Sequence, residues 1–290
     1  MDAATAALPT PSESELLDLE RLAVDLACAA ARFIRDERPG TVEVAQTKTS
    51  ALDIVTAMDT AAERLLRDRL AAERPDDAIL GEEGGSTGGS SGLTWVLDPI
   101  DGTVNYLYDI PAYAVSVAVV VGDPQLPGRW QPVAGAVANP RVGEVFHARL
   151  GGGSRAGAVD GPATDGRPLR VSERQDLATA LVGTGFSYDR AERDLQGQVA
   201  HRVLCEVRDL RRMGSAALDL CAVAAGALDG YYERGLHAWD RAAGQLVVTE
   251  AGGRVSGLDG PPTVEMVVAG GPGIHEPLRL LVEQSLRQAH

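Results

Sequence analysis

The sequence predicts a mixed α/β (α+β) fold in which helices and sheets pack in layers. Near both ends of the chain, apolar residues recur every three or four positions, which is typical of amphipathic helices. Several middle segments instead have the period-2 alternation of strands. No segment repeats at a fixed period, which argues against a repeat architecture. The 290 residues therefore fit one large domain, or two packed subdomains, of the layered class.

The first predicted element is an amphipathic helix that begins close to residue 12. Residues 1–11 are rich in Ala, Thr and Pro without periodicity, so we expect a mobile N-terminus. Ser12 and Glu15 have the spacing of a capping box, and apolar residues follow at helical spacing up to Pro39. A second helix is expected from about residue 53 or 55 through residue 70.

The period changes to that of strands after this helix. Strands are expected at residues 78–80, 93–97, 113–121, 133–138, 143–148, 180–183 and 230–233. Helices are expected again at residues 190–205, 214–225, 239–251 and 275–288. The Gly- and Ser-rich run at residues 84–92 lacks the Gly-Lys-Ser/Thr ending of a phosphate-binding P-loop, so it is interpreted as a flexible linker between two strands.

The composition excludes several classes of function. The chain has 27 basic and 41 acidic side chains and a formal net charge of −14, so we expect no direct binding of nucleic acid. No apolar run reaches the roughly 18 residues of a membrane-spanning helix, and the first residues lack a secretory signal, which predicts a cytoplasmic protein with no membrane partner. The three widely spaced cysteines indicate buried free thiols. No Gly-x-Ser-x-Gly elbow is present, so a hydrolase built on this chain would use water as its nucleophile.

The most informative segment is Trp-Val-Leu-Asp-Pro-Ile-Asp-Gly-Thr at residues 95–103, where an apolar strand ends in two carboxylates. Pro99 fixes its own φ and biases Asp98 toward an extended conformation, so the two carboxylates are held together in a stiff turn. A divalent cation relieves their repulsion. Mg²⁺ prefers oxygen ligands, which Asp98, Asp101 and the main-chain carbonyl of Ile100 offer.

The two residues that follow suit a phosphate group. Gly102 allows a phosphate to approach the backbone N–H groups, and Thr103 offers a hydroxyl. A purely structural alternative remains for this segment. In that alternative Asp98 is the N-cap of a helix and Asp101 is an acid in its first turn, favoured by the helix dipole.

Two further segments place acids at the end of a strand or the start of a helix. Ile-Leu-Gly-Glu-Glu-Gly at residues 79–84 ends a short strand in Glu82 and Glu83. Trp-Asp-Arg-Ala-Ala-Gly at residues 239–244 places Asp240 at a helix start. Taken alone, the two glutamates would be solvated turn residues and Asp240 an N-cap. Together with the segment at residues 95–103 they favour one shared site.

These segments resemble, in the same order, the motifs of the inositol monophosphatase family of Mg²⁺-dependent phosphatases. The family pattern ends in Thr-Glu-Ala-Gly-Gly, which is present here at residues 249–253. The resemblance extends from about residue 47 to residue 270 and is greatest to the bacterial SuhB-type branch. It implies a layered αβαβα sandwich of the inositol monophosphatase and fructose bisphosphatase type. Residues 12–160 would supply most metal ligands, and residues 161–290 would supply Asp240 and the substrate wall of one compact catalytic unit.

The resemblance also implies a role for each matching residue. Two or three Mg²⁺ ions would be held by Glu82, Asp98, Ile100, Asp101 and Asp240. Asp59 would pair with Thr103 to orient the attacking water, with Glu82 as the third catalytic residue. The substrate would contact Asp101, Gly102, Thr103, Gly214, Ser215, Ala216, Glu233 and Asp240. Lys48, the single lysine of the chain, is either part of a loop that closes over the site or a solvated surface residue.

The implied activity is hydrolysis of myo-inositol 1-phosphate to myo-inositol and phosphate by metal-activated water. Relatives with the same metal motifs act on fructose 1,6-bisphosphate, histidinol phosphate or adenosine 3′,5′-bisphosphate, and Glu233 with its neighbours favours an inositol. A rival of another class is a SuhB-type binding partner of the transcription machinery whose phosphatase activity is secondary. The resemblance further implies a homodimer.

Overall fold

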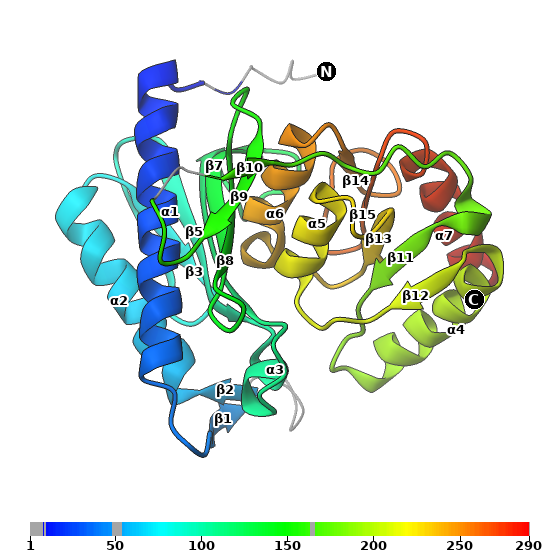
Figure 1. The fold of residues 1–290 in the computed structure, drawn as a ribbon, viewed down its shortest axis with the longest axis horizontal. Helices are drawn as coiled ribbons and strands as arrows, with labels where there is room; N and C mark the ends of the chain where they lie inside the picture. The colour runs from blue at the N-terminus through cyan, green and yellow to red at the C-terminus, as the bar shows by residue number, and fades with distance from the viewer. Residues whose placement is uncertain (1–7, 9, 48–53, 163–165, 290) are drawn as a thin grey trace.

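The computed structural model describes residues 8, 10–47, 54–162 and 166–289 (Figure 1). Its α-helices are α1 (Glu13–Asp36), α2 (Ala57–Glu73), α3 (Thr103–Leu107), α4 (Arg190–Glu206), α5 (Ala216–Ala224), α6 (Ala238–Glu250) and α7 (His275–Ala289). These helices and two large sheets form five layers, in the order helix, sheet, helix, sheet, helix. The αβαβα sandwich implied by the resemblance is therefore confirmed.

The larger sheet has eight strands in the order β10-β9-β8-β7-β6-β5-β3-β4. The strands are β3 (Ala78–Gly81), β4 (Gly85–Thr87), β5 (Leu93–Asp101), β6 (Ala114–Gly122), β7 (Trp130–Asn139), β8 (Glu144–Arg149), β9 (Ser154–Ala158) and β10 (Arg167–Pro168). Neighbours are antiparallel except β3 and β5, which run parallel. Helices cover both faces of this sheet, so nearly every residue of β6 and β7 is buried, which explains their continuous apolar runs.

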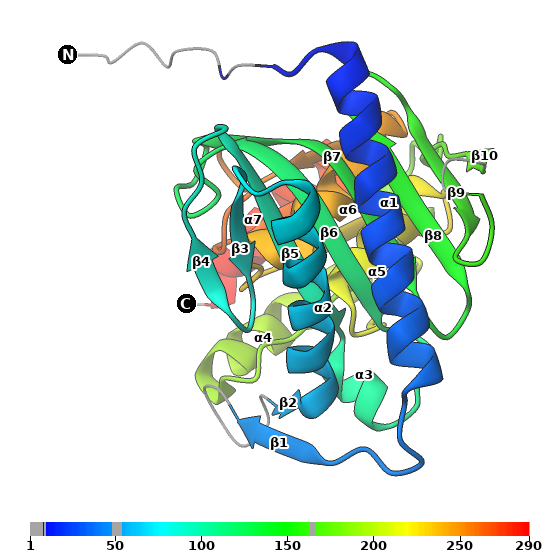
Figure 2. The same ribbon diagram turned by 90° about the vertical axis from the view of Figure 1, so that its left-hand side faces the viewer.

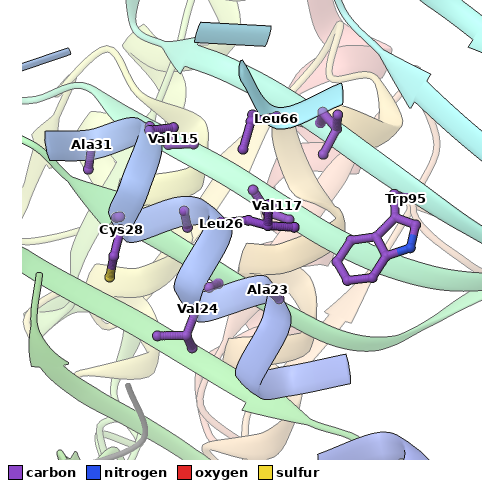
Figure 3. Close-up of a cluster of buried hydrophobic side chains, with 14 of the residues drawn as sticks. Ala23, Val24, Leu26, Cys28, Ala31, Leu66, Trp95, Val115 and Val117 are labelled. Atoms are coloured by element: carbon purple, nitrogen blue, oxygen red, sulfur yellow. The ribbon is translucent and has the colours of Figure 1, made fainter. Parts of the chain in front are cut away.

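The outer face of the larger sheet is covered by α1 and α2 (Figure 2). Ser12 caps α1, because its Oγ accepts a hydrogen bond from Glu15 N at 3.3 Å, as the sequence predicts. The apolar side of α1 buries Ala23 and Leu26 in a cluster that also contains Leu66 of α2 and Trp95 of β5 (Figure 3). Burying this apolar surface is the main contribution that holds the outer helices to the sheet.

The inner face packs against α5 and α6, which lie between the two sheets (Figure 1). The smaller sheet has the order β12-β11-β13-β15-β14 and is covered on its far side by α4 and α7. Its strands are β11 (Leu181–Thr184), β12 (Asp209–Arg211), β13 (Gly230–Glu233), β14 (Arg254–Ser256) and β15 (Val267–Gly270). Along β13, Tyr231 faces α5 and α6 whereas Tyr232 faces α4 and α7, as the alternation of a strand requires.

The structure corrects three expectations. Cys28 and Cys221 are buried as expected, but Cys205 is exposed. The second helix begins at Ala57 and not at residue 53 or 55, and Thr56 is the N-cap of this helix. The residues before it form β2 (Ile54–Thr56), which pairs with β1 (Val44–Thr47). The run at residues 84–92, expected to be a flexible linker, contains β4, whose backbone pairs with β3. The short strands β1, β2, β4, β9, β10, β12, β14 and β15 were not predicted.

Most of residues 1–11, and Lys48, lie outside the described residues. The division of the chain at residue 160 stays a prediction, as does the cytoplasmic location. Among the described helices, none is both long enough and apolar enough to cross a membrane.

Glu20 joins α1 to the larger sheet and contributes to stability in a pH-dependent way. Its buried carboxylate lies 2.8 Å from His147 Nδ1 and accepts a hydrogen bond from Arg149 Nη1 at 2.9 Å. Burial alone would raise the pKa of Glu20, but these two partners outweigh it and hold the pKa below the ordinary value of 4.5.

We expect Glu20→Gln to lower the free energy of unfolding at neutral pH by about 1–3 kcal/mol, because a neutral amide replaces the carboxylate that accepts the hydrogen bond from Arg149. A carboxylate with a lowered pKa contributes fully above its unfolded value and loses that contribution as the pH falls through its folded value. The urea unfolding curves of the two proteins should therefore converge below pH 4.5. Glu13→Gln, at an exposed position of α1, is the matched control. A difference that persists undiminished in acid would contradict this account.

Candidate active site

Two aspartates of β5 and one of α6 converge on one point. One carboxylate oxygen from each of Asp98, Asp101 and Asp240 lies within 4.8 Å of the others. β5 lies inside the larger sheet, and α6 packs directly on that sheet. The three side chains are therefore held by rigid elements before any ligand arrives.

An irregularity in β5 explains why its two aspartates point to the same place. Residues three apart in a regular strand point to opposite faces, but the pairing of β5 with β6 shifts between Asp98 and Asp101. Across Pro99, Asp98 Oδ1 accepts a hydrogen bond from Ile100 N at 3.0 Å. Asp98 is thus not a helix N-cap, and the structural alternative for this residue is wrong.

Gly102 is the residue that lets the chain turn from β5 into α3. Its φ is +95°, and it is the N-cap of α3. A Cβ at this position would lie 3.0 Å from both the Ala112 and the Gly214 carbonyl oxygens. Only glycine fits without strain, so the turn brings the segment from Asp101 to Thr103 close to the loop before α5.

Hydrogen bonds fix the orientation of Asp101 and Asp240. Asp101 Oδ2 accepts from Ser215 Oγ at 2.6 Å and from Ala217 N at 2.7 Å, both at the start of α5. Asp240 Oδ2 accepts from His237 N at 2.6 Å. His237 is the N-cap of α6, so Asp240 occupies the third helical position and not the N-cap expected in the structural alternative.

Glu82 reaches the same site from β3. Its N–H donates to Leu97 O at 3.1 Å, which fixes the turn after β3 beside β5. The buried carboxylate of Glu63 on α2 accepts from the next two backbone groups, Glu83 N and Gly84 N, both at 2.8 Å. These hydrogen bonds hold the turn in place, with Glu82 and Glu83 partly exposed.

The electrostatics of the cluster match a divalent cation. Burial, followed by the charges of Glu82, Asp101 and Asp240, raises the pKa of Asp98 well above its ordinary value. Burial raises the pKa of Asp101 to about 6, and burial with the charge of Glu82 raises that of Asp240. These shifts show that the charges repel one another. Convergent carboxylate oxygens without sulfur or imidazole are the donor set that Mg²⁺ prefers, so the residues fit the implied metal.

Asp59 and Thr103 form the hydrogen-bonded pair that the family resemblance implies. Thr103 Oγ1 lies 3.1 Å from Asp59 Oδ1 and 3.1 Å from the carbonyl oxygen of Ile100, so its proton has two acceptors. The second carboxylate oxygen of Asp59 accepts from Thr56 N at 2.9 Å and from the Thr56 hydroxyl. Burial raises the pKa of Asp59 to about 6. Thr56, which holds this carboxylate, was not predicted as a site residue.

A cavity of about 480 Å³ opens over the cluster and brings most of the predicted residues together. Its walls include Glu82, Asp98, Ile100, Asp101, Gly102, Thr103, Gly214, Ala216, Glu233 and Asp240. Ser215 is buried behind them and donates its hydroxyl to Asp101, so its predicted contact with a substrate would be indirect. Asp59 also lies behind the wall, on the far side of Thr103.

Glu233 is held at the edge of this cavity by Tyr231, whose hydroxyl donates to Glu233 Oε2. A Cβ at Gly185 would fall 2.0 Å from this carboxylate, so only glycine leaves room for it. Burial raises the pKa of Glu233 to about 7, and the bond from Tyr231 counteracts that rise. Tyr231 therefore stabilises the ionised, hydrogen-bond-accepting form of Glu233.

Sequence reasoning missed two arginines that line the cavity. Arg212 and Arg234 lie among walls that also carry six carboxylates, and Arg234 pairs with Glu192. Arg212 lowers the pKa of Glu233 through its charge. Arg212 lies two residues before the matched Gly214, and Arg234 directly follows Glu233. That adjacency to matched residues is the one signal in the sequence that could have identified them.

Comparison with known proteins agrees with this geometry. The model of the inositol monophosphatase family matches residues 15–286. The inositol-1-monophosphatase SuhB of Mycobacterium tuberculosis is 44% identical, over 93% of this chain and 94% of that protein. A solved structure of Mycobacterium tuberculosis SuhB, 45% identical, covers 93% of this chain and 97% of its own with a TM-score of 0.76. The Nus factor SuhB of Pasteurella multocida is 39% identical, over 74% of this chain and 75% of that protein. The chain therefore belongs to the inositol monophosphatase family, whose members are metal-dependent phosphomonoester hydrolases.

Proposed function

We propose that this protein hydrolyses myo-inositol 1-phosphate to myo-inositol and phosphate and that it depends on Mg²⁺. The observation that carries the proposal is the convergence of Asp98, Asp101 and Asp240 on the wall of a cavity that also contains Thr103 and Glu233. This site combines oxygen ligands for a hard cation with a hydroxyl and a carboxylate that can bind the substrate.

The acidic residues and one carbonyl would hold two or three Mg²⁺ ions. The proposed ligands are Glu82, Asp98, the carbonyl of Ile100, Asp101 and Asp240. Once bound, such ions neutralise charge on the phosphate and lower the pKa of water so that it can act as the nucleophile. The hydroxyl of Thr103 donates a hydrogen bond to Asp59. A lone pair of the Thr103 oxygen is then available to accept a hydrogen bond from the attacking water. The backbone N–H groups of Gly102 and Thr103 would bind the phosphate.

The far side of the cavity would bind the alcohol. Carboxylates accept hydrogen bonds from hydroxyl groups, and Glu233 offers a carboxylate on the wall of the cavity. Gly214 and Ala216 add backbone groups, and Ser215 orients Asp101 from behind. The volume of about 480 Å³ lies within the range of small-molecule sites and suits a phosphorylated monosaccharide-sized ring.

Phosphate release from a panel of phosphomonoesters, with and without Mg²⁺, tests the proposal. The panel contains myo-inositol 1-phosphate, fructose 1,6-bisphosphate, histidinol phosphate and adenosine 3′,5′-bisphosphate. We expect Mg²⁺-dependent turnover with the highest kcat/KM for myo-inositol 1-phosphate. A higher kcat/KM for another member would replace the substrate, and turnover without divalent cations would overturn the metal assignment.

A second candidate function is that of a binding partner of the transcription machinery. It is favoured by the Nus factor SuhB relative and by the net charge of −14, which suits contacts with proteins more than with RNA. We also propose a homodimer, from the family resemblance, which light scattering of the purified protein would test.

Tyr231→Phe tests the role of Glu233 in binding the alcohol. We expect KM for myo-inositol 1-phosphate to rise by about tenfold, because a hydrogen bond to a charged group contributes about 1.5–3 kcal/mol and its loss frees the Glu233 carboxylate. For phenyl phosphate, which has no sugar hydroxyls, KM should change little. Tyr232→Phe removes the same oxygen from the opposite face of β13 and is the matched control. Equal changes of KM for both substrates would assign Tyr231 to general packing instead.

A further inference from the structure

A second cavity lies beside the active-site cavity, and the stacked rings of His237 and Trp239 line both. We call it the Arg241 pocket. It has a volume of about 250 Å³ and lies between the loop that joins β6 to β7, the first turn of α6 and the loop before β15. No part of the proposed phosphatase reaction uses it.

The walls of the Arg241 pocket are mostly apolar and aromatic, and they carry a single permanent charge. The apolar walls are Leu80, Pro124, Pro127, Trp130, Trp239 and Val264. Arg241 supplies the charge, and none of the described residues that line the pocket is acidic. The Arg241 pocket thus differs in charge from the active-site cavity, whose walls carry six carboxylates, at Glu82, Asp98, Asp101, Asp189, Glu233 and Asp240.

Arg241 is a buried cation in the first turns of α6. Its side chain is only 4% exposed, and its Cζ lies 4.7 Å from the centre of the Trp130 ring. Its Nη1 donates to Gln245 Oε1 at 3.0 Å, but its Nε has no hydrogen-bond partner in the described part of the chain. Among the described residues, no carboxylate forms a salt bridge with it. A buried charge of this kind is unfavourable unless an anion pairs with it.

We propose that the Arg241 pocket binds a small planar aromatic carboxylate. The two indole rings and two prolines would stack on or border the ring of the ligand, and Arg241 would pair with its carboxylate. The volume limits the size of the ligand. An apolar cavity of roughly 150 Å³ accommodates benzene, whereas drug-sized ligands need roughly 300–1,000 Å³, so about 250 Å³ fits one ring with its carboxylate.

The position of the pocket links it to the active site. The residue before Arg241 is Asp240, and the shared wall of His237 and Trp239 begins the same helix. A bound ligand would therefore touch the turn of α6 that holds a carboxylate of the cluster. The binding itself does not depend on the proposed substrate, because it uses residues outside the phosphate site.

Saturation-transfer NMR with benzoate tests the proposal on the full-length protein stripped of divalent cations, so that benzoate has no metal to bind. Benzyl alcohol keeps the ring without the charge, and acetate keeps the charge without the ring. We expect saturable binding of benzoate in the micromolar to low-millimolar range and at least tenfold weaker binding of both comparison ligands. Arg241→Met should weaken benzoate binding by at least tenfold.

A second variant leaves the buried residues intact. Gln125 is exposed at the rim of the pocket, and Gln125→Glu places a carboxylate there that repels benzoate and competes for Arg241. It should weaken binding by at least tenfold, whereas Gln131→Glu, the same change at an exposed position outside the pocket, should not. The proposal is wrong if benzoate shows no saturable signal or if Gln125→Glu binds it like the wild type. Equal binding of acetate or benzyl alcohol would overturn the ligand class.

Discussion

Asp98→Asn should lower kcat/KM for myo-inositol 1-phosphate by at least about a thousandfold at saturating Mg²⁺. The substitution keeps the shape of the side chain, and its remaining oxygen can still accept the bond from Ile100 N. It removes one of three convergent negative charges, however, and with it the affinity for the divalent cation that we propose as the cofactor. A thousandfold loss of kcat/KM corresponds to about 4 kcal/mol of transition-state stabilisation. A bound metal ion contributes several kcal/mol of such stabilisation.

The same variant should be at least as stable as the wild type when no divalent cation is present. Burial and neighbouring charges raise the pKa of Asp98, so its ionised form is destabilising at neutral pH, and a neutral amide removes the repulsion. We expect Tm of the metal-free protein to stay constant or to rise by a few degrees, whereas stabilisation by added Mg²⁺ should decrease. Calorimetry with and without Mg²⁺ measures both effects.

Asp189→Asn is the matched control. Asp189 lines the same cavity but lies outside the cluster, as the N-cap of α4, a position where asparagine serves equally well. Its activity should remain close to that of the wild type. Full Mg²⁺-dependent turnover by Asp98→Asn would show that the metal assignment is wrong.

Asp98→Asn also separates the two candidate functions. A partner of the transcription machinery would bind through its surface, and Asp98 is almost completely buried. Binding to such a partner should therefore survive the substitution, while hydrolysis should not. A cellular function that is lost together with turnover would favour the phosphatase.

Thr103→Val should lower kcat by about a hundredfold and change KM little. Valine has nearly the same shape as threonine but cannot bridge Asp59 and the attacking water, so the nucleophile is no longer aligned. The metal cluster keeps all of its carboxylates, and the substrate still finds its binding groups. Steady-state kinetics with myo-inositol 1-phosphate at saturating Mg²⁺ measure the two constants separately.

Thr103→Ser provides the control, because it keeps the hydroxyl and removes only a methyl group. We expect it to retain most of the activity. Equal losses for Val and Ser would mean that the methyl group, through packing, matters more than the hydroxyl. An unchanged kcat for Thr103→Val would remove Asp59 and Thr103 from the proposed mechanism.

Local sequence was sufficient to predict the elements that carry the cluster. The apolar run that ends in Asp98, the rigid Pro99 and the Gly102 turn predict a strand followed by convergent carboxylates, and the structure contains both. The helix that bears Asp240 is equally clear from its periodicity. In each case the decisive residues are neighbours in the chain, so short-range chemistry determines the geometry.

Contacts between distant segments could not be predicted in the same way. Ser215 donates to Asp101 across 114 positions of the chain, and the acceptor role of Glu63 depends on a turn 20 positions later. Short strands such as β4 and β14 were missed because pairing with a neighbour stabilises them more than their own sequence does. The Gly-Ser-Thr sequence of β4 favours a loop when it is considered alone.

The order of the ligands along the chain affects how the protein is made. The ribosome releases Glu82, Asp98 and Asp101 long before Asp240, and the Ser215 and Ala217 groups that orient Asp101 also come late. A nascent chain that ends before α6 therefore has mutually repelling carboxylates but an incomplete site. Divalent cations should therefore stabilise the finished protein more than any synthesis intermediate that lacks α6.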